Sequence, residues 1–105
     1  MGSFTEGELS MFQYKAGYKF VNGGVHAQVL DFPAAISCGS DLDDARRMLG
    51  IALIDVAETL LDIGEALPRP DPSASDLEMD LEEPIYLHLS TSSEVTREPA
   101  GVVVP

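Results

Sequence analysis

The stretch DLDDARRMLGIALIDVAETLLDIG, residues 41–64, predicts the central element of the fold. Its apolar residues recur every three or four positions, which is the period of an α-helix. Asp41 can accept the first unpaired backbone N–H groups, and Asp44 follows it at the spacing of a capping box; capping by Ser40 is the alternative. Gly64 suits the left-handed backbone conformation that commonly follows the last residue of a helix. We therefore expect a helix from Asp41 to the residue before Gly64.

The apolar residues of this helix form a stripe wide enough to cover a sheet. At about 100° per residue, the members of the stripe point in one general direction. They are Leu42, Ala45, Leu49, Ala52, Leu53, Val56, Leu60 and Ile63. Asp43 and Asp44 in the first turn also suit the positive end of the helix dipole.

The residues before the helix predict strands. Residues 11–21 alternate between apolar and polar side chains and are rich in aromatic residues, which is typical of a half-buried strand. Asn22-Gly23-Gly24 is a turn sequence, so residues 25–30 are expected to return as the second strand of a hairpin. The proline of Asp31-Phe32-Pro33 ends that strand, and residues 34–38 are apolar enough for a third.

The residues after the helix predict a stiff linker and one more strand. Residues 68–73 contain three prolines, whereas residues 84–90 alternate again. Because this fourth strand opens with a proline, we expect it at an edge of the sheet. The expected organisation is a disordered or tag-like N-terminus over residues 1–10, one domain over residues 11–90 and an extended tail over residues 91–105.

Composition and charge narrow the class of protein. The chain has 105 residues, 18 acidic and 6 basic side chains, and a formal net charge of −12. Nucleic-acid affinity comes largely from Lys and Arg that neutralise phosphates, so direct nucleic-acid binding is not expected. One cysteine excludes an internal disulfide. The chain has no apolar run long enough for a membrane span and no cationic signal peptide, so we expect a cytoplasmic protein with no membrane partner.

Three motifs, taken in order, resemble those of the HicB antitoxin family. Asp31-Phe32-Pro33-Ala34-Ala35 stands where the family has Asp-aliphatic-Pro-Gly-Cys. Residues 39–45 open the helix in the manner of Gly-x-Thr-x-x-Glu-Ala, and residues 64–70 close it as Gly-x-x-x-Pro-x-Pro. Alanines replace the family's Gly-Cys, and Asp41 replaces its capping threonine. The resemblance covers roughly residues 12–90.

The resemblance implies a fold and a function. The implied fold is α+β, of partial ribonuclease-H-like type: an antiparallel three- to four-stranded sheet with one long helix packed on a face, in the order β-β-β-α-β. The implied function is that of an antitoxin that binds and masks a small, basic HicA-type toxin, which cleaves messenger RNA. The usual DNA-binding segment does not follow residue 90. The alternative is a stand-alone oligomeric interaction or regulatory module without a toxin.

A second apolar face of the helix is the candidate contact surface. Ile51, Ile54 and Leu61 fall roughly opposite the core stripe, and their neighbours there are Arg47, Glu58, Asp62 and Glu65. Such a patch can mark contact with another chain. We considered contact within a homo-oligomer (a dimer or tetramer), contact with the toxin, and either accidental exposure or cover by the C-terminal tail. The predicted contact residues are Ile51, Ile54, Glu58, Leu61 and Asp62.

A ribonuclease-H-like fold also calls for a search for paired carboxylates. Asp31 follows a strand, and Asp43, Asp44 and Asp55 lie on the helix. Two-metal chemistry needs carboxylates that hold two ions about 3.5–4 Å apart. The two aspartates of the first turn are better explained as helix-start charges and Asp55 as an outer-face residue, so we expect no metal centre and no enzyme activity.

The remaining reactive side chains favour structural roles. Neither His26 nor His88 has a sequence-near nucleophile or orienting acid, so both are interpreted as solvated strand residues. Cys38 has no Cys-x-x-Cys spacing and no nearby histidine, and we expect a small buried hydrophobe. No catalytic residue and no cofactor are expected.

Overall fold

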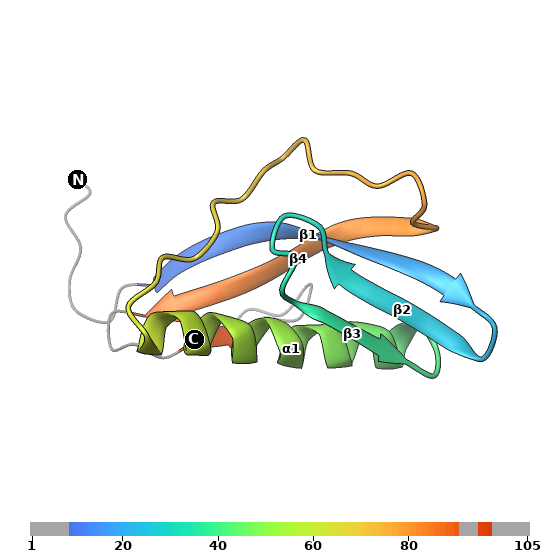
Figure 1. The fold of residues 1–105 in the computed structure, drawn as a ribbon, viewed down its shortest axis with the longest axis horizontal. Helices are drawn as coiled ribbons and strands as arrows, with labels where there is room; N and C mark the ends of the chain where they lie inside the picture. The colour runs from blue at the N-terminus through green and yellow to red at the C-terminus, as the bar shows by residue number, and fades with distance from the viewer. Residues whose placement is uncertain (1–8, 91–94, 98–105) are drawn as a thin grey trace.

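The computed structural model describes residues 9–90 and 95–97 and shows an α+β fold (Figure 1). Its elements are β1 (Leu9–Val21), β2 (Gly24–Val29), β3 (Ile36–Gly39), α1 (Leu42–Asp62), β4 (Leu81–Ser90) and β5 (Val95–Arg97). The strands form one antiparallel sheet in the order β3-β2-β1-β4-β5. The predicted fold class, an antiparallel sheet with one long helix on a face, is confirmed.

The β1–β2 hairpin forms the middle of the sheet. Its register places Tyr18 opposite Ala27 and Ala16 opposite Val29. All four side chains are buried, as the alternation of residues 11–21 predicts. The turn places Gly23 at a φ of 90°, a backbone conformation that costs glycine nothing.

Both ends of α1 carry the expected caps. The Asp41 side chain accepts a 2.8 Å hydrogen bond from the backbone N–H of Asp44, so Asp41 rather than Ser40 is the N-cap. The Asp44 carboxylate reaches back to the backbone N–H of Ser40 at 2.9 Å. At the other end, Gly64 has a φ of 80° and follows the last helical residues. Local sequence therefore sets both boundaries.

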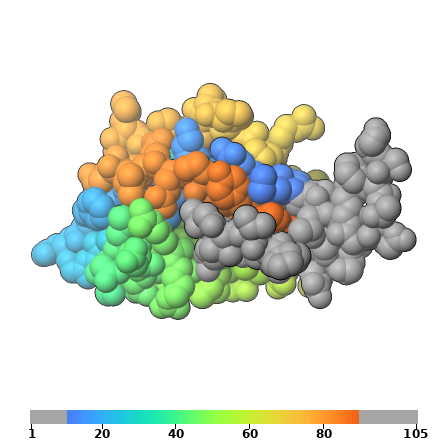
Figure 2. Space-filling view, turned by 180° about the vertical axis from the view of Figure 1, so that it is seen from behind, coloured from blue at the N-terminus to red at the C-terminus, as the bar shows by residue number. Residues whose placement is uncertain are grey.

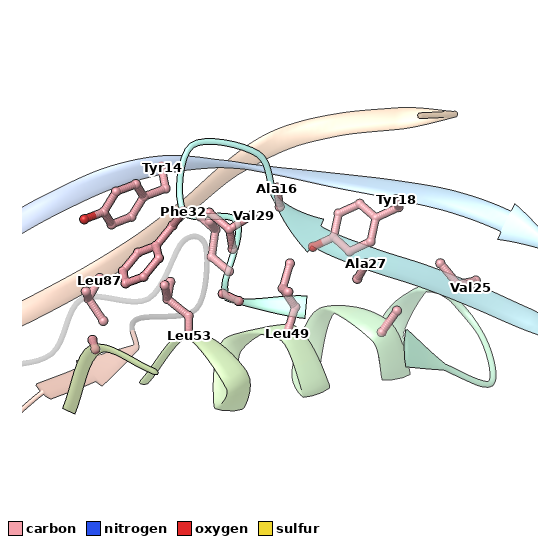
Figure 3. Packing of buried hydrophobic residues seen from close by; sticks show 14 residues of the cluster. Tyr14, Ala16, Tyr18, Val25, Ala27, Val29, Phe32, Leu49, Leu53 and Leu87 are labelled. Carbon is pink, nitrogen blue, oxygen red and sulfur yellow. The ribbon is translucent and has the colours of Figure 1, made fainter. Parts of the chain in front are cut away.

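The core lies between α1 and one face of the sheet (Figure 3). Tyr14 and Phe32 pack edge to face with ring centroids 5.2 Å apart. In the space-filling view from behind, β4 in orange and α1 in green belong to the two layers around this core (Figure 2). The helix contributes four buried apolar side chains. They are Ala45, Leu49, Leu53 and Ala57. Full burial of a leucine side chain stabilises the folded state by about 1.5–3 kcal/mol.

One member of the predicted core stripe is misplaced. Ile63 is 65% exposed, and Ala57 is the last buried residue of the helix. Ile63 is the C-cap residue that follows the last helical residue, Asp62, so it does not continue the direction of the helical stripe.

The segment between α1 and β4 crosses the opposite face of the sheet (Figure 1, yellow to orange). We call residues 65–80 the linker. Lys15 donates to the carbonyl of Pro72 at 3.5 Å, and Lys19 donates to that of Glu78 at 3.1 Å. The backbone N–H of Asp80 donates to the carbonyl of Tyr18 at 2.8 Å. The linker is therefore fastened along β1.

The prediction that the fourth strand is an edge strand was wrong. β4 pairs with β1 on one side and with β5 on the other, so β3 and β5 are the edges. β5 pairs only with Leu87–Leu89, which leaves the proline at position 84 without a strand on its outer side among the described residues.

The sheet also extends into two segments that were predicted as termini. β1 begins at Leu9, and β5 lies within residues 91–105; the rest of the tail and residues 1–8 lie outside the described residues.

Candidate interaction surface

The outer side of the second half of α1 carries acidic side chains in a row. Asp55, Glu58 and Asp62 are spaced three and four residues apart, and all are exposed. We call these three residues the acidic ridge. Ile51 lies one turn before Asp55 on the same side and is 43% exposed. Residues three and four apart are neighbours on a helix surface, so the four side chains form one continuous surface.

Among the side chains that the structure describes, no ion pair joins Asp55, Glu58 or Asp62 to a basic residue. Arg46 and Arg47 lie near the start of the helix. Arg46 pairs with Asp43 at 3.2 Å, and Arg47 pairs with Asp44 at 2.6 Å. The two lysines of β1 hold the linker on the other face of the sheet. Between Arg47 and the end of α1 the helix carries three acids and no base.

The position of the acidic ridge opposes the helix dipole. Acidic side chains stabilise the N-terminal end of a helix and destabilise the C-terminal end, where the backbone carbonyls gather. The first turn of α1 follows this rule with Asp43 and Asp44, whereas the last turn contains Asp62 and no basic residue. Asp62 therefore does not improve the stability of the isolated chain.

The structure separates the five predicted contact residues into two groups. Ile51, Glu58 and Asp62 are exposed on the outer side of α1. The expectation that Ile54 and Leu61 lie opposite the core was wrong, because both are half-buried and pack against it. α1 contacts β5 as well as β2 and β3, so the sheet encloses more of the helix than one face. Asp55, which was not among the predicted contact residues, is exposed on the same side of the helix.

An ion pair closes the core between α1 and β4. The Arg46 guanidinium binds the Glu83 carboxylate through two hydrogen bonds, of 2.9 and 3.0 Å. Burial raises the pKa of the Tyr18 hydroxyl, and the negative charge of Glu83 adds to this effect. The arrangement joins elements 37 residues apart in the chain, so it serves as a structural clamp. Sequence reasoning did not indicate this pair.

A second tyrosine fastens the start of the linker. The Tyr14 hydroxyl donates to the carbonyl of Pro68 at 2.7 Å. Burial, followed by the nearby charge of Asp31, raises the pKa of Tyr14 to about 12. Both buried tyrosines are therefore neutral near pH 7 and act as part of the core.

Three of the four carboxylates considered for metal binding have other partners. Asp31 accepts the backbone N–H groups of Lys15 and Asp71, each at 2.9 Å. Asp43 and Asp44 pair with arginines of the same helix. Within residues 9–90 and 95–97, no group of three or more His, Cys, Asp or Glu side chains is placed to hold a metal ion.

Cys38 lies on the surface, against the prediction that it is buried. It pairs with His26 across β2 and β3, and Ile36 is also exposed on its strand. The linker makes its bonds to β1, to β4 and to Asp31, and Cys38 is exposed. His26 and His88 are half-buried strand residues.

In the part of the chain that the structure describes, no helix is both long and apolar enough to cross a membrane. Comparison with family models, with curated proteins and with solved structures gave no match.

Proposed function

We propose that this chain is a binding protein without catalytic activity, of the HicB antitoxin type, that masks a small basic RNA-cleaving toxin of the HicA type. The observation that carries the proposal is the acidic ridge, whose three exposed carboxylates form no ion pair with any side chain that the structure describes. A basic partner would supply those cations and relieve the unfavourable interaction between the ridge and the end of the helix dipole. Opposite charges also steer association and raise its rate.

Ile51 adds an apolar element to this surface. Protein interfaces combine a desolvated apolar centre with a polar rim. Ile51 is 43% exposed beside Asp55 and Glu58, so a partner that covers it also meets the acidic side chains. The motifs at residues 31–35, 39–45 and 64–70 give the proposal its family.

The alternative function is a stand-alone, oligomeric HicB-like module without a toxin. The observation that favours it is the open edge strand β3, which is uncharged and carries the exposed Ile36. Such an edge suits assembly whether or not a toxin exists.

Co-expression with the neighbouring gene tests the proposal. If that gene encodes a short basic protein with a histidine suited to RNA cleavage, we expect the two proteins to co-purify and to separate as salt is raised. Glu58→Lys is expected to weaken the pair. Glu78→Lys is the matched control, because it makes the same change of charge at an exposed position on the linker. A toxic neighbour that the wild-type chain neither binds nor neutralises would rule out the proposal.

A further inference from the structure

β3 leaves one edge of the sheet open. It pairs with β2 on one side and with no described strand on the other. An edge strand presents unpaired backbone N–H and C=O groups, and proteins usually protect such edges with lysine, proline or a bulge. The sequence of β3 is Ile-Ser-Cys-Gly, which contains neither charge nor proline. Ile36 is 50% exposed and Cys38 is also exposed.

The surroundings of β3 are the uncharged part of a strongly acidic chain. Residues 20–40 contain one charged side chain, Asp31, and that carboxylate is bound by two backbone N–H groups. The hairpin tip next to β3 adds Val21, which is 47% exposed (Figure 1). Its neighbour Phe20 pairs with Val25 and therefore lies on the helix side of the sheet, whereas Ile36 and Cys38 pair with Gln28 and His26 on the opposite side. We call Val21, Ile36 and Cys38 the neutral face.

We propose that a second copy of this chain covers the neutral face, with β3 pairing antiparallel to β3 of the other copy about a two-fold axis. A two-fold interface must be complementary to itself, and an uncharged apolar surface meets this condition. An acidic surface such as the ridge does not, because two copies would repel each other there. The acids that follow β3 in the chain are engaged within the start of α1: Asp41 accepts the backbone N–H of Asp44, and Asp43 and Asp44 pair with Arg46 and Arg47.

The dimer is independent of the proposed toxin binding. The neutral face lies beside β3 and the hairpin tip, whereas the acidic ridge lies on the second half of α1. A basic partner gains no charge interaction at the neutral face, which favours a second copy as its occupant. Charge reversal on the ridge is therefore expected to leave the dimer unchanged.

Cys38 reports the pairing directly, since it is the sole cysteine of the chain. Any thiol crosslink must join two copies. If both helices stay on the same face of a continuous sheet, the exposed positions 36 and 38 of one copy align with those of the other. In the registers that place Cys38 opposite Cys38 or opposite Ile36 of the other copy, the two Cys38 side chains lie about 5–8 Å apart, within reach of a short bismaleimide.

The test measures the mass of the full chain by sedimentation as its concentration is varied, together with crosslinking. We expect the mass of two copies at high concentration, and a crosslinked dimer that is absent for Cys38→Ser. Ile36→Lys is expected to weaken the dimer about tenfold or more, since the pairing would bury a charge. Leu77→Lys is the matched control, because Leu77 is fully exposed on the linker and the change of charge is identical; it should leave the dimer intact.

Three results would overturn the inference. They are a monomer at every concentration, a dimer that Ile36→Lys leaves unchanged, and a dimer that Ile51→Lys disrupts while Ile36→Lys does not. The third result would place the contact on α1 instead. Circular dichroism of each variant shows whether it is folded, and Ile36 is exposed enough for lysine to be accommodated in the monomer.

Discussion

The carboxylate of Asp31 accepts a 2.9 Å hydrogen bond from the backbone N–H of Asp71, forty residues further along the chain. The same carboxylate accepts the backbone N–H of Lys15 at 2.9 Å. One side chain at the end of β2 therefore holds β1 and the linker together. Asp31, the first residue considered as a metal ligand, therefore has a structural role.

Replacing Asp31 should loosen the linker. We expect Asp31→Ala to lower the free energy of unfolding by about 1–2 kcal/mol, because two backbone donors lose a charged acceptor. Asp31→Asn keeps one acceptor oxygen and should lose less. Urea unfolding measures both, and limited proteolysis should show earlier cleavage within residues 65–80. Equal stability of wild type and Asp31→Ala would contradict this role.

The helix cap should make stability sensitive to acid. The backbone N–H of Ser40 and then the hydrogen bond from Arg47 hold the pKa of Asp44 below its ordinary value of 3.8. A carboxyl whose folded pKa is lowered stabilises the fold above its unfolded pKa, and this contribution is lost as pH falls through the folded pKa. Asp44→Asn should therefore flatten the fall in melting temperature below about pH 4. Asp55→Asn, at an exposed position outside the cap, should retain the slope of the wild type.

Gly39 is required where β3 meets the start of α1. A Cβ at this position would collide with the backbone N of Ala45 and would lie 2.7 Å from its Cα. Because both atoms belong to the backbone, we expect Gly39→Ala to cost at least about 2 kcal/mol of unfolding free energy. Gly17→Ala is the control, since its Cβ would meet the flexible Met79 side chain at 2.8 Å. A smaller loss for Gly39→Ala than for Gly17→Ala would be inconsistent with this packing.

The acidic ridge should reduce the stability of the isolated chain. Asp62→Lys places a positive charge in the last turn of α1, where it complements the helix dipole, so we expect the melting temperature to rise by about 1–4 °C. Glu78→Lys makes the same change of charge away from the helix and separates the dipole effect from net charge. A fall in melting temperature for Asp62→Lys would show that the ridge stabilises the fold.

The sequence predicts most of the fold because local patterns specify it. Alternation defines the β1–β2 hairpin, and Asp41 and Gly64 set the ends of α1. The assignment of β4 to an edge failed because β5 is only three residues long and its sequence carries no clear strand pattern. Pairing between strands distant in the chain is decided by tertiary context, which a local pattern does not contain.

The candidate surface was predictable to a smaller extent. Helical spacing placed Ile51, Glu58 and Asp62 on the outer side of α1 correctly. The positions of Ile54 and Leu61 were predicted wrongly because we assumed that only the core stripe of the helix contacts the sheet. In the structure, α1 contacts β5 as well as β2 and β3, and both side chains pack against the core. The open edge at β3 follows from strand order, so it became visible only in the assembled sheet.

Inhibition of RNA cleavage tests the proposed function most directly. The neighbouring basic protein is assayed for RNA cleavage with and without an equimolar amount of this chain. We expect the wild type and Glu78→Lys to suppress cleavage, and the double variant Glu58→Lys/Asp62→Lys to leave it largely intact while remaining folded. Cleavage that continues in the presence of the wild type, or suppression by the double variant equal to that by the wild type, would contradict the role of the acidic ridge.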